Sequence, residues 1–261
     1  MPRRCAVANT LAIAGKELRS YFASPIAYVV IGLYALLFGY FFLLFLTAFA
    51  EQSMRMAAMG MNQPVNVNQM MIRPMLGNMS VIGLFILPML TMRAYAEEKR
   101  SGTFELLLTA PLTDLQIVLG KFLGSLSLYT IMLAVSSLNV LLLFWWGNPE
   151  WRQVATSYLG LFFIGASFIA LGLFISSLTK NQIVAGIITF AVALILWVIS
   201  WVGDSAGELG RAIVSGLSVI EHYDDFSKGV VDTKHVVYYL SFIAFGLFLT
   251  VKSVDSERWR G

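Results

Sequence analysis

Long apolar runs are the feature that most constrains the fold of this 261-residue chain. A helix needs about 20 apolar residues to cross the hydrocarbon core of a bilayer, where no water is present to pair with free backbone groups. Charged residues make up only 13% of the chain, whereas about 25% is usual in soluble domains. We therefore expect an all-α membrane protein that forms one transmembrane domain over residues 1–261. The six predicted transmembrane helices are residues 26–49, 79–92, 115–146, 154–178, 183–202 and 236–251.

The distribution of Lys and Arg sets the expected orientation of these spans. Twelve of the 18 Lys and Arg residues lie on the side of the two termini, and six lie on the opposite side. Cytoplasmic flanks of membrane proteins are enriched in these residues, so both termini and the polar segment 93–114 are expected in the cytoplasm. The basic residues cluster beside apolar spans, and this placement indicates membrane topology rather than binding of nucleic acid.

Residues 6–22, ahead of the first span, carry apolar side chains at helical spacing. Lys16 lies on the opposite face and Arg19 lies toward its edge. We predict an interfacial amphipathic helix at the membrane surface, with both cations near lipid headgroups. The alternative is a surface helix that packs on the bundle. The predicted apolar face consists of Val7, Leu11, Ala14, Leu18, Tyr21 and Phe22.

The stretch 204–235 precedes the last span and lies on the outer side in this topology. Within it, residues 209–220 are apolar but too short to cross, so we predict a re-entrant or interfacial segment. His222 and Asp224 or Asp225 could share a metal. Ordinary polar surface without a metal is favoured, because the chain has only two histidines.

The outer segment 51–78 is rich in methionine. Thioether sulfur binds Cu(I), which makes a copper site one interpretation. Methionines also fill adaptable surfaces that contact a partner, and this second interpretation is favoured. The residues concerned are Met54, Met56, Met59, Met61, Met70 and Met71.

The sequence lacks the groups with which a membrane protein would power transport by itself. Ion-coupled transporters carry ionisable residues within their spans, but here Lys121 lies near the start of a span and its long side chain is expected to reach the interface. An ATPase Walker A motif needs Ser or Thr after Gly-Lys, but Gly120 and Lys121 are followed by Phe122. The HExxH and GxSxG motifs of common hydrolases are also absent. We therefore predict a non-catalytic protein, to which another subunit supplies energy.

The polar segment 93–114, between the second and third spans, carries signals of local structure. The helix of the second span is expected to continue to Arg100, with Glu97 one turn earlier as a candidate ion-pair partner. A glycine favours a helix end, so Ser101-Gly102 is expected to break this helix.

A short helix is predicted over residues 103–109. It should end before Pro111, because the residue that precedes a proline disfavours helix, and Thr113 with Gln116 forms a capping box that starts the third span. Such a short helix is not stable in isolation, so it needs a surface to rest on. We interpret it as a docking element; the alternative is a solvated loop with a lipid-facing leucine patch. Its predicted apolar face is Phe104, Leu107 and Leu108.

On these features the chain resembles the permease subunits of type-two ABC exporters. The similar stretches are GKELRSYFASP at residues 15–25 and AEEKRSGTFELLLTAPL at residues 96–112, together with the six spans and the outer segment before the last. Residues 226–250, with the ELLLTAP form of the second stretch, are most similar to the gliding-motility-associated branch. The resemblance covers essentially the whole chain.

This resemblance implies a permease that uses ATP hydrolysis by a separate ABC ATPase subunit. The ATPase binds ATP and Mg, and no cofactor is expected in this chain. Such permeases lie in the bacterial plasma membrane among its lipids and pair with a second copy or a similar chain, and an extracytoplasmic auxiliary protein is a further expected partner. They export hydrophobic or amphipathic substrates, or transmit force to extracytoplasmic partners. The alternative function is a membrane assembly or anchoring protein without transport.

The resemblance also implies two sets of functional residues. A cytoplasmic coupling helix and its flanks contact the ATPase, and the second and fifth spans line a central pathway. The coupling residues carried over are Glu97, Glu98, Arg100, Gly102, Thr103, Phe104, Glu105, Leu106, Leu107, Leu108 and Thr109. The pathway candidates are Phe85, Pro88, Met89, Phe190, Leu194 and Trp197.

Overall fold

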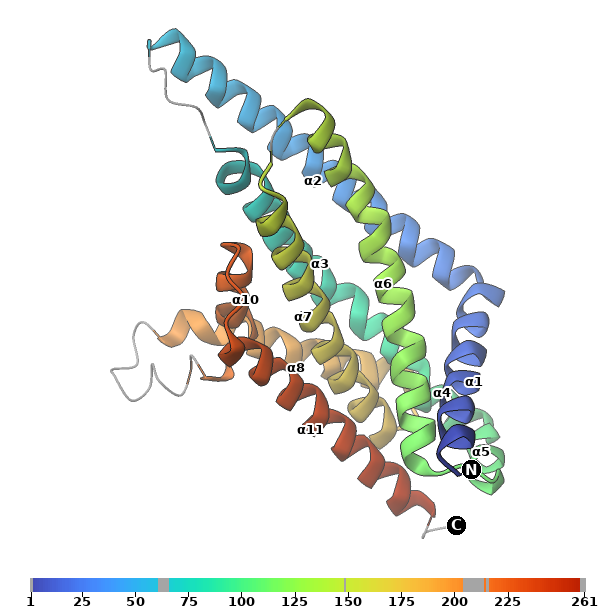
Figure 1. Ribbon diagram of the computed structural model, residues 1–261. Helices are drawn as coiled ribbons and strands as arrows, with labels where there is room; N and C mark the ends of the chain where they lie inside the picture. The colour runs from blue at the N-terminus through green and yellow to red at the C-terminus, as the bar shows by residue number, and fades with distance from the viewer. Residues whose placement is uncertain (1, 61–65, 148, 204–213, 215, 259–261) are drawn as a thin grey trace.

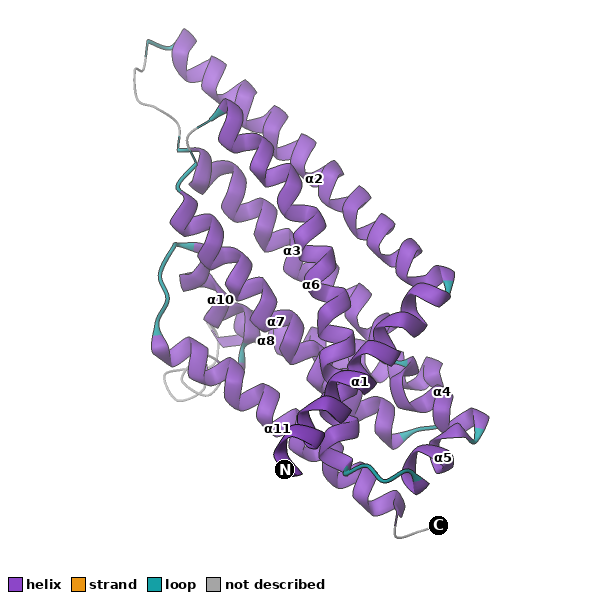
Figure 2. Cartoon of the chain, turned by 45° about the vertical axis from the view of Figure 1, so that its right-hand side comes forward, coloured by secondary structure: helices purple, strands orange, loops and turns teal. Residues whose placement is uncertain are grey.

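The computed structural model describes residues 2–60, 66–147, 149–203, 214 and 216–258, without the side chains of residues 2–6, 108, 146, 202 and 203. Helices and their connecting loops make up this part of the chain (Figure 2). The elements are α1 (Pro2–Ala23), α2 (Pro25–Ala58), the π-helical turn η1 (Asn68–Ile72), α3 (Arg73–Thr91), α4 (Arg93–Ser101), α5 (Thr103–Thr109), α6 (Asp114–Trp146), α7 (Trp151–Leu178), α8 (Gln182–Gly203), α10 (Val219–Ser227) and α11 (Thr233–Arg258).

Six helical stretches are long and apolar enough to cross a membrane. The predicted all-α membrane fold is thereby confirmed. The second stretch extends well beyond the apolar run 79–92, because η1 precedes α3 and α4 follows it. The stretches are Pro25–Ala58, Asn68–Ser101, Asp114–Trp145, Trp151–Leu178, Gln182–Trp201 and Thr233–Arg258.

The central helix of the bundle is α7, since 72% of its most apolar window is buried, against 17% in α8 and in α11. Small residues let its neighbours approach closely. A Cβ added to Gly165 would lie 2.0 Å from Tyr129 Cε1, and one added to Gly172 would lie 2.0 Å from Thr91 Oγ1. Lipid tails are as apolar as the helices, so close van der Waals contact at such small residues is a main source of helix association in membranes.

The first helix, α1, packs along the first turns of α6. Ile13 contacts the position of Gly120 so closely that a Cβ there would lie 2.5 Å from its Cγ2, and Ala14 is also buried. Val7 and Leu11, by contrast, are exposed. The predicted apolar face is therefore divided, and α1 is a helix packed on the bundle with part of that face left open.

At the end of the bundle away from the termini, α10 is held by the second and fourth spans. Arg73 forms an ion pair with Asp224 and donates from Nε to Ser227 Oγ at 3.0 Å, while Gln153 Nε2 donates to the Ser227 carbonyl at 2.7 Å. Half of the predicted re-entrant segment 209–220, residues 209–213 and 215, lies outside the described residues. Within those residues, the His, Cys, Asp and Glu side chains form no group of three that could hold a metal.

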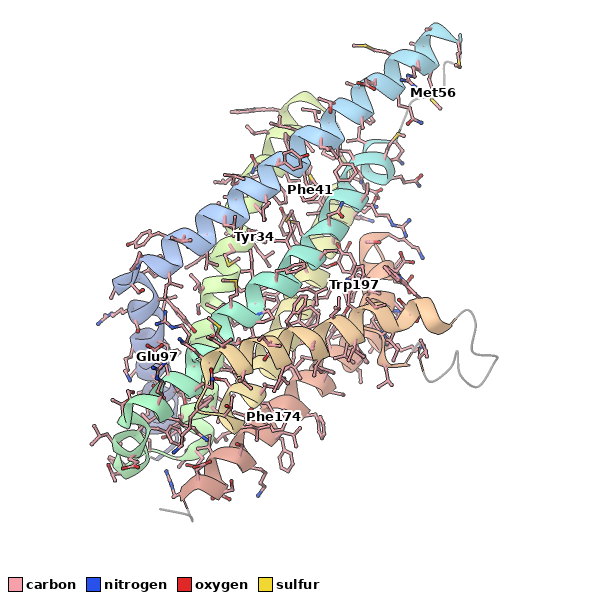
Figure 3. All side chains as sticks on the ribbon, turned by 180° about the vertical axis from the view of Figure 1, so that it is seen from behind. Tyr34, Phe41, Met56, Glu97, Phe174 and Trp197 are labelled. Atoms are coloured by element: carbon pink, nitrogen blue, oxygen red, sulfur yellow. The ribbon has the colours of Figure 1, made fainter. Side chains whose placement is uncertain are left out.

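The methionine-rich segment lies partly on the last turns of α2, which reach Ala58. Met56 and Glu97 mark opposite ends of the molecule (Figure 3). Met54 and Met59 are exposed, whereas Met71 and Met75 are buried in the core. The exposed methionines thus lie on the last turns of α2 and directly after its end, and this end of α2 projects from the bundle (Figure 1).

Candidate functional site at the α4–α5 elbow

The polar segment between the second and third spans forms the elbow α4–α5, at the same end of the bundle as both termini (Figures 1 and 2). Gly102 ends α4 with φ +74°, a left-handed conformation that glycine adopts without steric cost. The short helix α5 has the predicted bounds, and the predicted capping box of Thr113 and Gln116 starts α6. Local signals therefore predicted the bounds of α5 and the start of α6 correctly.

Phe104 attaches α5 to the bundle. Its side chain is 4% exposed, and its ring meets that of Tyr95 edge to face at a centroid distance of 6.1 Å. Lys99 Nζ lies 5.4 Å from the Phe104 centroid, within cation–π range. Phe104 points inward. The prediction that it belongs to a free apolar face with Leu107 and Leu108 is therefore wrong.

The face of α5 that points away from the bundle carries Leu106. This side chain is 72% exposed, and Glu105 and Thr109 are exposed beside it, whereas Leu107 is half-buried. The side chain of Leu108 lies outside the described part. A large exposed leucine on a helix anchored by a buried aromatic ring is a surface that a partner could cover.

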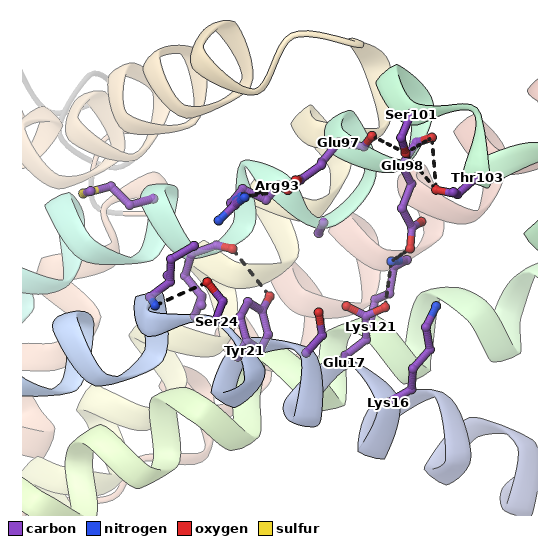
Figure 4. A pocket seen from close by; sticks show the side chains of 15 residues that line it. Lys16, Glu17, Tyr21, Ser24, Arg93, Glu97, Glu98, Ser101, Thr103 and Lys121 are labelled. Carbon is purple, nitrogen blue, oxygen red and sulfur yellow. Dashed lines mark hydrogen bonds and ion pairs between the residues drawn. The ribbon is translucent and has the colours of Figure 1, made fainter.

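Lys121 connects three helices beside the elbow (Figure 4). Its side chain is 2% exposed, and Nζ lies 2.9 Å from Glu17 Oε1 in α1 and 2.7 Å from Glu98 Oε1 in α4. The same ammonium lies 5.2 Å from the Tyr95 ring centroid. The expectation that Lys121 reaches the interface is wrong, because two carboxylates pair with it inside the protein. Sequence reasoning did not single out Glu17, whose partner is 104 residues away.

Arg93, Glu97 and Lys99 of α4 also have charged or polar partners, but the pair predicted between Glu97 and Arg100 does not form. Glu97 accepts hydrogen bonds from Arg93 Nε at 2.7 Å and Nη2 at 3.1 Å, instead of pairing with Arg100, which is exposed. Lys99 is buried and donates from Nζ to the Ser177 carbonyl at 2.5 Å, near the end of α7. Carbonyls in the last turn of a helix have no partner within the helix, so a lysine there is well placed.

The junction between α3 and α4 depends on a serine from α7. Ser176 Oγ accepts hydrogen bonds from the backbone N–H groups of Tyr95 at 3.1 Å and Ala96 at 3.2 Å, and donates to the Met92 carbonyl at 3.0 Å. In a continuous helix the Ala96 N–H would bond to the Met92 carbonyl directly. The hydroxyl thus takes a place in the helical hydrogen-bond ladder, a recognised cause of helix kinks.

A cavity of about 360 Å³ lies between α1, the α3–α4 junction and α6 (Figure 4). Lys16, Arg93 and the Glu17–Lys121–Glu98 link are among its lining groups, and Met89 is one of its apolar lining residues. Tyr21 also lines it; its hydroxyl lies 3.1 Å from Ser125 Oγ, and burial raises its pKa to about 12. Among the charges that line the cavity, Lys121 pairs with Glu17 and Glu98, and Arg93 pairs with Glu97.

The predicted pathway residues fall into two groups. On α3, Phe85 and Met89 are exposed; on α8, Leu194 is exposed, and the Phe190 ring lies 5.0 Å from that of Phe85. Their helical spacing of three and four places them, with Trp197, along one side of the α3–α8 pair. Pro88 differs, since it is buried within the bundle. Lys16 and Arg19, the predicted membrane-interface residues, are both exposed on α1.

The comparison with family models gives one finding. The model described as ABC-2 family transporter protein matches residues 53–203, more than half of the chain. This range includes the α4–α5 elbow and the α3 and α8 residues just described, and it ends before α10 and α11. No curated protein matches the chain.

Proposed function

Because the chain belongs to the ABC-2 family of transporter proteins, we propose that it is the membrane permease subunit of an ATP-binding cassette exporter. A permease of this family works with an ABC ATPase subunit. In this proposal the ATPase binds ATP and Mg, hydrolyses the ATP, and docks on the α4–α5 elbow from the cytoplasm. The permease itself carries out no chemical step.

The observation that supports the proposal is that α5 has one face attached to the bundle and one face exposed. Phe104 fixes the helix to the bundle through Tyr95 and Lys99, while Leu106 and Glu105 face outward. A helix of seven residues is unstable alone, so this anchoring is what would let it transmit a displacement. Movement of α5 would pass to α4, and from α4 across the Ser176 junction to α3, which bears Phe85 and Met89.

The test is Leu106→Asp in the full chain, co-expressed with its cognate ABC ATPase and placed in lipid vesicles. We expect membrane insertion and thermal stability to stay unchanged, since Leu106 is 72% exposed, while stimulation of ATP hydrolysis by the permease is lost. Val230→Asp is a matched control, because Val230 is an exposed apolar residue at the opposite end of the bundle. Full stimulation in the Leu106 variant would refute docking through α5.

Two permease chains are proposed to face one another across the exposed side of α3 and α8. The apolar side chains there suit hydrophobic or amphipathic substrates. Replacing Leu194 with Cys, in a chain whose Cys5 is changed to Ser, should give disulfide-linked dimers on oxidation. The same substitution at Leu240, exposed on α11, should not.

The finer assignment concerns orientation and branch. We place both termini in the cytoplasm on the basis of the Lys and Arg distribution, and we place the chain in a bacterial plasma membrane on the basis of its family. Residues 226–250, with the ELLLTAP form of the elbow, support the gliding-motility-associated branch. A second candidate function is anchoring of extracytoplasmic machinery, which the projecting end of α2 with Met54 and Met59 favours. ATP hydrolysis that responds to lipid or peptide substrates supports transport; a stable complex indifferent to both supports anchoring.

A further inference from the structure

The last turn of α11 contacts the chain on both sides of α5. Glu257 Oε1 lies 3.0 Å from Lys99 Nζ, four residues before α5 begins. Arg258 Nη2 lies 2.9 Å from Asp114 Oδ1, the first residue of α6, and donates to the Leu112 carbonyl at 3.4 Å. Two successive residues of the sixth span thus bind the entry and the exit of the elbow.

The contact on the entry side reaches α5 itself. Lys99 is held by Glu257 and by the Ser177 carbonyl, and its ammonium faces the ring of Phe104. Ser253, one turn before Glu257, donates to the same Ser177 carbonyl at 3.4 Å. The ammonium that faces the buried ring of α5 is therefore held in part by an ion pair that α11 supplies.

The contact on the exit side fixes the segment that returns to the membrane. Residues 110–113 link α5 to α6 without helical hydrogen bonding, so their path is set by contacts with other elements. Arg258 binds the start of α6 and the carbonyl of Leu112 together, which ties this link to α11. With both flanks tied to one helix, α5 cannot rotate unless α11 moves or an ion pair opens.

We propose that Glu257 and Arg258 are positioning residues that hold α5 in the orientation from which it transmits the ATPase movement. The sixth span thereby becomes part of the coupling apparatus, although it lies outside the matched family range. This inference rests on the proposed function of α5. It differs from a purely stabilising role, because it requires the two ion pairs for coupling and not for assembly.

The two ion pairs of α11 are weak enough to open and close. Lys99 and Asp114 are mostly covered, while Glu257 and Arg258 are each 37% exposed. Ion pairs with one partner in solvent contribute modestly and are partly screened by salt. They can therefore open during a transport cycle, whereas the Lys121 link is more fully enclosed.

The experiment uses Glu257→Gln and Arg258→Gln in the full chain with its cognate ATPase. First, hydrogen exchange of residues 103–112 in the purified permease should rise about three- to tenfold, because the flanks of α5 open more often. Second, the affinity for the ATPase should stay within about twofold, while stimulation of ATP hydrolysis falls at least fivefold. Lys252→Gln, an exposed change on the same helix, should alter neither quantity.

Charge exchange distinguishes positioning from general damage. The double variant Lys99→Glu with Glu257→Lys should recover stimulation relative to each single variant, and Asp114→Arg with Arg258→Asp should do the same. The proposal would be overturned if the Gln variants changed neither the hydrogen exchange of residues 103–112 nor the stimulation of ATP hydrolysis. It would also be overturned if hydrogen exchange rose while stimulation stayed complete, or if neither double variant recovered stimulation. If stimulation instead survives Leu106→Asp while exchange still responds to Glu257, docking through α5 fails and the contacts of α11 stand as structure alone.

Discussion

Lys121 Nζ lies 2.7 Å from Glu98 Oε1, and this contact joins the third span to the elbow that follows the second. Glu17 of α1 binds the same ammonium, so one lysine connects three helices. A charge removed from water is costly unless it is paired, and here the compensation comes from two carboxylates and the face of Tyr95. The elbow is thus fixed to the bundle from two sides, by Lys121 on one and by α11 on the other.

Replacing Lys121 with Met should destabilise the protein strongly. Glu17 and Glu98 would be left close together and largely covered, without the cation that neutralises them, and loss of one partner of a buried pair costs about 3 kcal/mol or more. Thermal unfolding of the purified chain in detergent would measure the loss. Lys16→Met is the control, because Lys16 lines the same cavity but is exposed, and it should change stability by less than about 0.5 kcal/mol. Equal melting temperatures for the two variants would show that the link contributes little.

The sequence was informative about α5 and uninformative about its surroundings, for a physical reason. The bounds of α5 depend on Gly102, Pro111 and the Thr113 capping box, each of which acts within a few residues. The partners of Lys121 and Lys99 come from α1 and α11, and helical spacing carries no information on such distant pairs. Only their identity as charged residues was visible, so Lys121 was assigned to the interface.

The orientation of apolar side chains shows the same limit. Periodicity predicted that Phe104 lies on a free face, and it did not include Ile13 in the apolar face of residues 6–22. In the structure Phe104 packs on Tyr95, and Ile13 is buried because Gly120 gives it room. In a chain with apolar residues on every side of its helices, which residue faces the protein is decided by the shape of the neighbouring helix rather than by spacing.

Replacing Ser176 with Ala should disturb the α3–α4 junction. The N–H groups of Tyr95 and Ala96 would lose their acceptor inside the protein, which costs about 1–3 kcal/mol unless the helix rearranges. We expect lower thermal stability in detergent together with weaker stimulation of the ATPase. Ser167→Ala is matched in burial and helix, but Ser167 Oγ bonds only within α7, to the Phe163 carbonyl at 2.9 Å, so it should be nearly neutral. A Ser176 variant that behaves like the Ser167 variant would show that the hydroxyl is not needed at the α3–α4 junction.

Replacing Gly172 with Ala should separate α3 from α7. The new Cβ would lie 2.0 Å from Thr91 Oγ1 and 2.7 Å from Thr91 Cβ, so one helix must shift, at a cost of about 1–3 kcal/mol. Gly39→Ala in α2 meets no atom within 4 Å and should be neutral or stabilising by up to about 1 kcal/mol. Thermal unfolding of the pair in the same detergent gives the comparison. Similar stability of both variants would mean that the two spans are packed less tightly than described.

Acid should destabilise the contact between α10 and α11 through His222. This ring is buried, stacks on Tyr238 at a centroid distance of 3.7 Å, and lies 5.0 Å from the ring of His235. Burial lowers the pKa of His222 below its ordinary value of 6.5, and the nearby His235 and Lys234 add to this effect against the opposing Ser218 carbonyl and Glu221. The unfolded chain therefore binds a proton at a higher pH than the folded chain does.

The sign of the effect follows from that difference. The stability that neutral His222 contributes is complete above about pH 6.5 and is lost as the pH falls from there through the folded pKa. Asp225 behaves differently, because its hydrogen bond with His235 lowers its pKa below 3.8. The stability that ionised Asp225 contributes is therefore lost only in stronger acid than this experiment covers. When melting temperatures are measured from pH 8 to pH 5, they should thus decrease once the pH is lower than about 6.5. In His222→Phe, which keeps an aromatic ring on Tyr238 but takes up no proton, the decline should be smaller; an unaltered decline would assign the acid sensitivity to another group.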